Sequence, residues 1–362
     1  MTGQQQRIVV LGAGYAGLSA ARRLARKARD TTITVVDTRA EFVERVRLHQ
    51  AAAGQSIRRW DLRELLERKG VEFVRARVTA LDPDAKRVWL DGEWSMGYDT
   101  LVYALGSAAD RASVPGVADH AHSVATPEDL RALPAGPVIV VGAGSTGIEL
   151  AAELAESQRD SRVTLLGSEE PGSWLSTAAT ERIRTTLTGL GVQIRASVKV
   201  AEVLSDGVRL VDGTVLSAAA VVWTAGFTVP DLARRAGLAV DEQGRIRTDA
   251  TLRSISHPDV YAAGDAALID GPGDRPLRMA CATALPAGSY VATAIVARAS
   301  GAEPKPMTFR YQLQCISLGR HDAVIQFLHA DDSPANRVVR GRAGAWVKER
   351  IVRIAGRAAG LR

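Results

Sequence analysis

The chain contains two glycine-rich segments whose residue types and spacing suit the binding of a dinucleotide pyrophosphate. They are Gly12-Ala13-Gly14-Tyr15-Ala16-Gly17 and Gly142-Ala143-Gly144-Ser145-Thr146-Gly147. In this pattern the first glycine permits a tight turn, the second lets the pyrophosphate approach the backbone, and the third allows close packing of helix and strand. The anion then accepts hydrogen bonds from free N–H groups at the positive end of a helix dipole. We therefore predict that two nucleotides bind.

Each glycine-rich segment lies between a predicted strand and a predicted helix. Short apolar runs, residues 7–11 and 137–141, precede the segments, and alanine- and leucine-rich stretches with helical spacing follow them. This context matters because a glycine-rich turn alone would place no helix N-terminus behind the anion. The context therefore favours nucleotide binding over two simple turns.

In the first unit, the second predicted strand (residues 32–36) is followed directly by Asp37. At this place a carboxylate can hold the 2′-hydroxyl of an adenosine ribose. We therefore predict that Asp37, together with Thr38 and Arg39 directly after it, contacts an unphosphorylated adenosine. The alternative is that Asp37 is only a turn residue at the end of the strand.

In the second unit, the corresponding strand (residues 162–166) ends at Gly167, and Glu169 and Glu170 follow slightly later. Without a carboxylate at position 167 or an arginine next to it, the sequence offers nothing that repels or attracts a 2′-phosphate. We therefore predict weak discrimination between the phosphorylated and the unphosphorylated nucleotide.

A third segment, residues 257–265, is predicted to be a strand that ends in a turn at Gly264 and Asp265. Together with the two glycine-rich segments, it resembles the FAD/NAD(P)-dependent pyridine nucleotide oxidoreductases, which carry two dinucleotide-binding domains. The resemblance covers nearly the whole chain and implies FAD on the first unit and NADH or NADPH on the second. It also implies that Asp265 holds the flavin ribityl chain, and that strands ending near Gly106 and Gly226 cross between the domains.

The same resemblance implies a fold class and domain limits. The class is α/β, with two Rossmann-like dinucleotide-binding domains, the second inserted in the first, and a small C-terminal α+β segment. We expect an FAD-binding domain over residues 1–109 and 245–300, an NAD(P)-binding domain over 110–244 and a C-terminal segment over 305–362. A chain of 362 residues with 46% hydrophobic residues is ample for such domains. The predicted cofactor contacts are Gly12, Gly14, Tyr15, Ala16, Gly17, Asp37, Thr38, Arg39, Arg47, Ala104, Gly106, Gly142, Gly144, Ser145, Thr146, Gly147, Glu149, Gly226, Gly264, Asp265, Ala280, Cys281 and Ala282.

Disulfide reductases of this family carry a redox-active cysteine pair shortly after the first ribose acid, but residues 41–54 of this chain contain no cysteine. The two cysteines, Cys281 and Cys315, lie elsewhere and form no metal-binding spacing, and we expect Cys281 to be packed inertly. The order of motifs and the absent dithiol resemble type II NADH dehydrogenase-like and apoptosis-inducing-factor-like quinone reductases. We therefore predict neither a metal site nor a redox-active disulfide.

The resemblance implies an FAD-dependent NAD(P)H dehydrogenase that passes electrons to a quinone-like or other small diffusible acceptor. Two alternatives stay open: a flavin-dependent reductase or dehydrogenase of a specialised metabolite, and a redox-sensing binding protein like the apoptosis-inducing factors. Glu149 resembles a family glutamate near the nicotinamide, and His49 lies in the segment that covers the flavin in relatives. Both are candidate catalytic residues. Alternatively, Glu149 could simply be a solvent-facing residue of its helix, and His49 could be an ordinary packed histidine.

The net charge of +6 and the isoelectric point of about 9.6 come without a nucleic-acid-binding signature. We expect the partners to be a nicotinamide nucleotide and a small acceptor, and the protein to be a monomer or homodimer. We expect a cytoplasmic location because the sequence shows neither a secretory leader nor a membrane span. Residues 337–362 contain eight arginines and lysines but one acid, Glu349, and an apolar stripe of Val347, Ile351, Ile354 and Ala355. This stripe predicts either peripheral contact with the inner face of the membrane or, as we favour, packing on the C-terminal strands.

Overall fold

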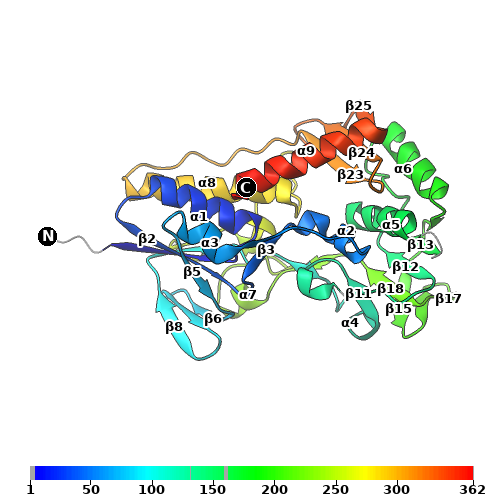
Figure 1. Ribbon diagram of the computed structural model, residues 1–362. Coiled ribbons are helices and arrows are strands. Elements are labelled where there is room, and N and C mark those ends of the chain that lie inside the picture. Colours follow the sequence, from blue (N-terminus) through cyan, green and yellow to red (C-terminus); the bar gives the residue numbers. More distant parts are fainter. Residues whose placement is uncertain (1–4, 131, 159–161, 362) are drawn as a thin grey trace.

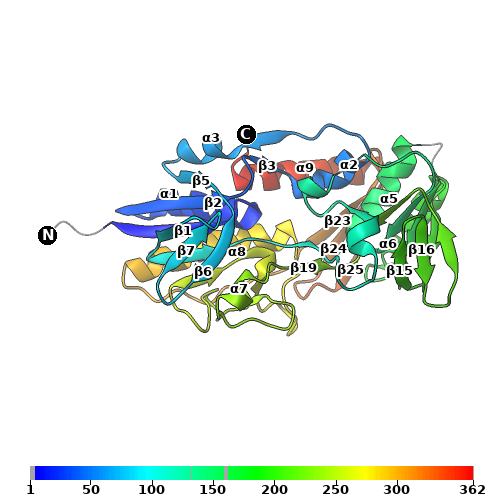
Figure 2. The same cartoon turned by 90° about the horizontal axis from the view of Figure 1, so that it is seen from below.

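The structure of the protein is a computed structural model that describes residues 5–130, 132–158 and 162–361. The molecule is elongated, with one parallel sheet toward each end (Figure 1). Three long helices lie along one side, namely α1 (Tyr15–Lys27), α8 (Cys281–Ala299) and α9 (Gly341–Ala359). Figure 2, turned by 90°, shows the second sheet and its hairpins at the end away from the N-terminus.

Each of the two main sheets has five strands, and all neighbouring strands in them run parallel. In spatial order the first sheet contains β21 (Val260–Ala262), β9 (Thr100–Tyr103), β1 (Gln6–Leu11), β2 (Thr31–Asp37) and β5 (Glu72–Arg75). The second contains β11 (Ala121–Ser123), β18 (Ala220–Trp223), β12 (Val138–Val141), β13 (Val163–Leu166) and β14 (Gln193–Arg195). In both sheets the strand before the glycine-rich segment is central, which is the order of a doubly wound dinucleotide-binding fold.

Continuous apolar runs make these strands, because parallel sheets are covered on both faces. All four residues of β12 are buried, as are all four of β9. Helices follow or connect these strands. They are α1 (Tyr15–Lys27), α2 (Leu48–Ala52), α3 (Leu62–Glu67), α4 (Val117–His120), α5 (Ser145–Ser157), α6 (Thr177–Gly189), α7 (Leu232–Arg235) and α8 (Cys281–Ala299).

The two units also contain smaller sheets and single turns. The three-stranded antiparallel sheets are β6 (Val78–Asp82), β7 (Arg87–Leu90) and β8 (Trp94–Gly97), and β15 (Val200–Leu204), β16 (Gly207–Leu210) and β17 (Val215–Ser217). The two-stranded pairs are β3 (Glu41–Val43) with β4 (Arg59–Asp61), β10 (Ala108–Ala109) with β19 (Phe227–Thr228), and β20 (Ile246–Arg247) with β22 (Ala267–Leu268). Three-residue 3₁₀ turns are η1 (Arg45–Arg47), η2 (Pro127–Asp129) and η3 (Gly264–Ala266).

The chain crosses between the two units at β10 and returns at β19, and these two strands pair with each other. After β19, Val229, Leu232 and Leu238 pack in the core of the first unit, although the expected second domain extended to Gly244. We therefore propose that the return boundary lies at β19. The outward boundary near residue 109 coincides with β10.

The C-terminal segment forms an antiparallel sheet of β23 (Leu313–Ser317), β24 (Ala323–Leu328) and β25 (Pro334–Arg340), followed by α9 (Gly341–Ala359). Residues 308–312, which precede β23, are not in strand conformation, since the chain first runs along the first unit, where Met307 N–H donates to Ala250 O (2.8 Å). Ile316 and Val324 of this sheet pack in the core of the second unit. Among the helices of the described ranges, none combines the length and apolar character needed to cross a bilayer.

The close crossing of α1 and α8 depends on Gly288, because a Cβ there would lie 2.1 Å from the carbonyl oxygen of Ala16. We predict that Gly288→Ala forces the helices apart and lowers the free energy of unfolding by about 1–3 kcal/mol. The matched control is Gly189→Ala at the exposed end of α6, where a Cβ meets nothing within 4 Å. This change should be neutral or stabilise the protein by up to about 1 kcal/mol. Urea unfolding of both variants measures the difference, and equal stabilities would contradict the account.

Candidate functional site

The two glycine-rich turns have the same geometry. Gly12 N–H donates to Val36 O (2.8 Å), and Gly142 N–H donates to Leu166 O (2.9 Å). In each turn a Cβ on the third glycine would lie 1.8 Å from the carbonyl oxygen of the first, which excludes any side chain at Gly17 and Gly147. A Cβ on Gly12 would also lie 2.4 Å from the carbonyl oxygen of Ala104, so the turn packs directly on the next strand.

The second glycine of each turn faces open space, as an approaching pyrophosphate requires. A Cβ at Gly14 or Gly144 would meet nothing within 4 Å. The first helical hydrogen bonds are donated by Leu18 to Gly14 O (2.9 Å) and by Ile148 to Gly144 O (3.0 Å). The amides that precede them can therefore point at an anion. These amides belong to predicted contacts, namely Tyr15, Ala16 and Gly17 in the first unit and Ser145, Thr146 and Gly147 in the second.

Asp37 lies at the carboxyl end of β2 and is buried, with 7% of its surface exposed. One carboxylate oxygen accepts a hydrogen bond from Ala13 N–H (2.7 Å). The other accepts from the N–H (2.9 Å) and the Nε (3.3 Å) of Arg39. Asp37 therefore holds the first glycine-rich turn and Arg39 together, beside a cavity of about 590 Å³ that Thr38 and Arg39 also line.

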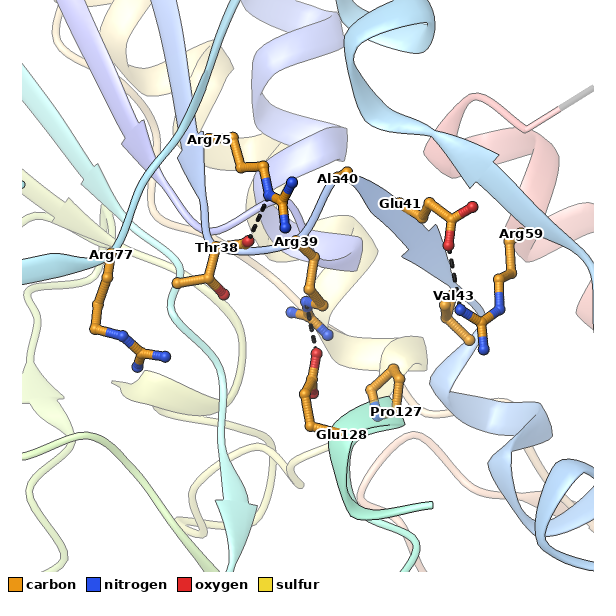
Figure 3. A pocket seen from close by; sticks show the side chains of 10 residues that line it. All are labelled: Thr38, Arg39, Ala40, Glu41, Val43, Arg59, Arg75, Arg77, Pro127 and Glu128. Atoms are coloured by element: carbon orange, nitrogen blue, oxygen red, sulfur yellow. Dashed lines mark hydrogen bonds and ion pairs between the residues drawn. The ribbon is translucent and has the colours of Figure 1, made fainter. Parts of the chain in front are cut away.

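This cavity is rich in arginines (Figure 3). Arg75 donates to Thr38 O (3.3 Å), Arg59 pairs with Glu41 (3.2 Å) and Arg39 lies 4.0 Å from Glu128 of the second unit. The cavity begins at Thr38, directly after the predicted ribose acid Asp37, and we propose that the adenosine half of a dinucleotide binds there. Its lining residues are Thr38, Arg39, Ala40, Glu41, Val43, Arg59, Arg75, Arg77, Pro127 and Glu128.

Asp265 lies in η3 and is held by two groups from other segments. Ser107 Oγ donates to Asp265 Oδ2 (2.6 Å), and Arg45 Nη1 lies 3.3 Å from the same oxygen. Arg45 also donates to Ser107 O (3.1 Å) and lies over the ring of Phe227 at 5.0 Å. Its Nη2 is buried and has no hydrogen-bond partner within the described ranges. Because the half-buried Arg45 retains an unused donor here, the site fits an anionic cofactor group.

The glycines predicted near Asp265 adopt backbone conformations that favour glycine. Gly264 has φ +75° and Gly106 has φ +71°, and they lie at the ends of the two strands that bring Asp265 and Ser107 together. Gly226 has φ +88° at the return crossing, beside Asp110. These three glycines lie around the expected flavin site at the carboxyl edge of the first sheet.

The start of α8 supplies the remaining predicted flavin contacts, Ala280, Cys281 and Ala282. Ala280 is the N-cap residue, and Thr283 donates its hydroxyl to Arg278 O (2.7 Å) and Ala280 O (2.8 Å). Cys281 and Cys315 are both free. Burial raises the pKa of the Cys281 thiol to about 11, so it stays protonated at neutral pH and is a poor nucleophile.

Arg47 does not lie with Arg45 at the Asp265 cluster. Its guanidinium pairs with Glu44 (2.9 Å) and with Glu349 of α9 (2.9 Å). Residues two apart in a 3₁₀ turn point in different directions, so only one of the two arginines in η1 can face Asp265. Arg47 thus links η1 to the C-terminal helix, and its contact with the cofactor stays a prediction.

Glu149 and His49 meet in a buried cluster with two residues of the C-terminal segment. Glu149 Oε1 accepts hydrogen bonds from Ser317 N–H (3.0 Å), Ser317 Oγ (3.2 Å) and Lys348 Nζ. His49 Nδ1 lies 3.7 Å from Glu149 Oε2, and its Nε2 lies 3.4 Å from Ser317 Oγ. We call these four residues, His49, Glu149, Ser317 and Lys348, the acid–base cluster.

Burial sets the protonation of the acid–base cluster. It lowers the pKa of His49 well below its usual value, with a further contribution from the charges of Lys348, Arg320 and Arg47. Burial and the charge of Arg47 lower the pKa of Lys348 to about 7. His49 is therefore neutral at neutral pH, and Lys348 gives up its proton more readily than an exposed lysine does.

At the end of β13, the structure explains why position 167 is glycine. A Cβ there would lie 2.5 Å from the Cβ of Ala143 and 2.6 Å from Glu169 O. Glu170 pairs with Arg184 (2.7 Å), and Glu169 accepts from Ser173 Oγ (2.9 Å). The weak discrimination between NADH and NADPH stays a prediction.

Several site residues were missed in the sequence. Arg45 and Ser107 carry no motif of their own, although Ser107 directly follows the predicted contact Gly106 and its position next to that turn was a usable signal. Lys348 and Ser317 reach Glu149 only because the C-terminal sheet packs on α5. No local pattern reports such a contact.

The Arg45–Asp265 pair should hold the cofactor of the first unit. We predict that Arg45→Met lowers FAD affinity at least about tenfold, because a charge-assisted hydrogen bond contributes about 1.5–3 kcal/mol. Arg63→Met is the matched control, since Arg63 lies on the exposed surface of α3 and pairs with Glu67. Titration of the two apoproteins with FAD, followed by flavin fluorescence, measures both constants. Equal affinities in the two variants would remove Arg45 from the site.

Comparisons with known proteins agree with this geometry. The chain is 35% identical over 319 residues to an NADH dehydrogenase-like protein of Mycobacterium tuberculosis, covering 80% of each chain. It is 28% identical over 370 residues to a type II NADH:quinone oxidoreductase of Staphylococcus haemolyticus, covering 90% of each. The fold is similar to that of the sulfide:quinone oxidoreductase of Aquifex aeolicus, with a TM-score of 0.83, 19% identity, and coverage of 98% of this chain and 92% of that one.

Residues 6–301 match the family described as pyridine nucleotide-disulphide oxidoreductase. This match, together with the relatives, confirms the predicted α/β fold with two dinucleotide-binding units and the prediction of an oxidoreductase that uses FAD with NADH or NADPH. The name of the family refers to a disulphide, whereas Cys281 and Cys315 are both free in this structure. The chain belongs to the pyridine nucleotide-disulphide oxidoreductase family.

Proposed function

We propose that the protein oxidises NADH or NADPH and reduces a quinone, with FAD as the intermediate carrier. The observation that carries this proposal is the buried acid–base cluster, which lies where the second unit, the segment after β3 and the C-terminal sheet meet. Two similar proteins support it, the type II NADH:quinone oxidoreductase of Staphylococcus haemolyticus and the sulfide:quinone oxidoreductase of Aquifex aeolicus.

The stoichiometry of quinone reduction explains why such a cluster is useful. NADH gives up two electrons and one proton as hydride, whereas a quinol contains two added protons. One proton per turnover therefore comes from water. FAD supplies the chemistry that accepts hydride from the nicotinamide and releases electrons to the acceptor.

The residues of this chain bind and orient the two cofactors and protonate the acceptor. The turns at Gly14 and Gly144 bind the two pyrophosphates, Asp37 and the arginine-rich cavity hold the adenosine half of FAD, and Asp265 with Arg45 holds its ribityl and phosphate part. Glu149 and Lys348 hold an exchangeable proton between them, and neutral His49 orients Glu149 through its Nδ1. Of the two candidate catalytic residues, we propose Glu149 as the proton donor and His49 as its positioning residue.

We further propose that α9 rests on a membrane surface that contains the quinone. Its buried stripe is Gly344, Lys348, Val352 and Gly356, which differs from the stripe predicted by the sequence. Of the predicted stripe, Val347, Ile351 and Ala355 are half-buried, because the helix packs on β24 and α1, whereas Ile354 is 61% exposed. Trp346 is 60% exposed, and the exposed arginines 342, 350, 353 and 357 surround it and Ile354; Arg362 lies outside the described residues.

An exposed tryptophan and isoleucine among arginines suit the boundary between lipid headgroups and acyl chains. Arg350 lies over the Trp346 ring at 4.6 Å, so the cation and the aromatic ring reach the surface together. The choice between monomer and homodimer stays a prediction.

The proposed activity is tested by rapid turnover of NADH and NADPH with menadione, a short-chain ubiquinone and glutathione disulfide. We expect both quinones to be reduced much faster than the disulfide, because burial keeps the thiols of Cys281 and Cys315 protonated. If no quinone is reduced while NADH still bleaches the flavin, the specialised-metabolite reductase becomes the better account. If NADH bleaches the flavin only slowly and no acceptor restores turnover, a redox-sensing binding protein is favoured.

The proposed membrane contact predicts a loss of vesicle binding in the double variant Trp346→Ser/Ile354→Ser. Removing two exposed apolar side chains should weaken partition onto phosphatidylglycerol–phosphatidylcholine vesicles at least about tenfold, or 1.4 kcal/mol. Trp94→Ser is the control, because Trp94 is 44% exposed on β8, away from α9. Vesicle sedimentation measures the partition. Equal losses in the control, or none in the double variant, would exclude α9 as the contact.

A further inference from the structure

Glu153 is a fully buried acid that the proposed function does not use. It lies on α5 one helical turn beyond Glu149, and its side chain is 0% exposed. Gln55 Nε2 donates to its Oε1, whereas its Oε2 is buried and has no hydrogen-bond partner among the described residues. An unpartnered buried oxygen costs about 1–3 kcal/mol, so a purely structural role explains this arrangement poorly.

The surroundings of Glu153 repeat those of Glu149. The helix α2 packs against α5, so that His49 of α2 contacts Glu149 and Gln55, just beyond α2, contacts Glu153. Residues one turn apart on a helix face have Cβ atoms about 5–6 Å apart. One water molecule can therefore connect the free Oε2 of Glu153 to the acid–base cluster and satisfy that oxygen.

On its outer side Glu153 has a route to solvent. Arg320, in the turn between β23 and β24, has its Nη1 3.7 Å from Glu153 Oε1, and it donates to Gln55 Oε1 (3.3 Å). The Arg320 side chain is 38% exposed. Arg320 and Gln55 therefore lie between a buried carboxyl group and water at the surface.

We propose that Glu153 is the proton reservoir that resupplies the acid–base cluster from the solvent side during quinone reduction. The step is a proton transfer without redox change: the carboxylic acid of Glu153 gives its proton through one water to Glu149, and water near Arg320 reprotonates it. This supplies the one proton per turnover that NADH does not provide. The inference rests on the proposed function, because only an acceptor that takes up protons needs a reservoir.

The electrostatics are consistent with this role. Burial raises the pKa of Glu153, and the neighbouring charge of Glu156 adds to the rise, while the hydrogen bond from Gln55 and the charge of Arg320 lower it. The charge of Arg320 also lowers the pKa of His49, so this arginine influences both ends of the route. Because the pKa of Glu153 is raised, the reservoir is filled at low pH and empties as the pH rises through that pKa.

The test compares Glu153→Gln with the wild-type holoenzyme in the reoxidation step alone. NADH-reduced protein is mixed rapidly with menadione, which takes up protons, or with ferricyanide, which takes up electrons only. We expect Glu153→Gln to slow reoxidation by menadione about 10- to 100-fold and to leave the ferricyanide rate and the FAD content unchanged. The fall of the menadione rate at alkaline pH should disappear in this variant, and Glu153→Asp should restore part of the rate.

Glu181→Gln is the matched control, because it makes the same chemical change on the exposed surface of α6. Its ratio of menadione to ferricyanide rates should equal that of the wild type. If Glu153→Gln slows reoxidation by menadione and by ferricyanide equally, the reservoir is overturned while the proposed function stands. A rate of reoxidation by menadione within twofold of the wild-type rate has the same consequence. A wild-type protein that reduces ferricyanide but no quinone instead overturns the proposed function, and the reservoir with it.

Discussion

The approach of a pyrophosphate to bare backbone is the constraint on which the rest of this structure depends. It requires a strand, a turn and a helix so close together that a Cβ on the third glycine would lie 1.8 Å from the carbonyl oxygen of the first, and the chain meets this requirement twice. Once Gly17 is fixed against Gly12, α1 lies over the first sheet, and the end of β2 brings Asp37 to the turn. The same reasoning places α5, and with it Glu149, in the second unit.

The parts of the site that touch these turns could be predicted from the sequence, because motif and function coincide there. Asp37 and Asp265 lie at strand ends with recognisable spacing, and the structure places both at the carboxyl edge of the first sheet. Arg45 and Arg47 show the limit of this reasoning. Two arginines in one short turn are equivalent in sequence, and only the path of the backbone through η1 decides that Arg45 meets Asp265 while Arg47 meets Glu349.

The acid–base cluster could be predicted only in part, since its members come from distant segments. Glu149 and His49 were predicted separately, but Lys348 lies 199 residues beyond Glu149 and reaches it through the packing of α9 on the C-terminal sheet. A lysine on an amphipathic helix would ordinarily point to solvent. Here it occupies the buried stripe of α9, where it faces a carboxylate instead, so that the C-terminal segment completes the site of the two nucleotide-binding units.

The central claim is that electrons leave the flavin without passing through a protein dithiol. The most direct measurement is an anaerobic reductive titration of the holoprotein with dithionite, followed by flavin absorbance. We predict that full reduction takes two electrons per FAD, because Cys281 and Cys315 are free thiols that accept none. Uptake of four electrons per FAD would reveal a redox-active disulfide and contradict the account.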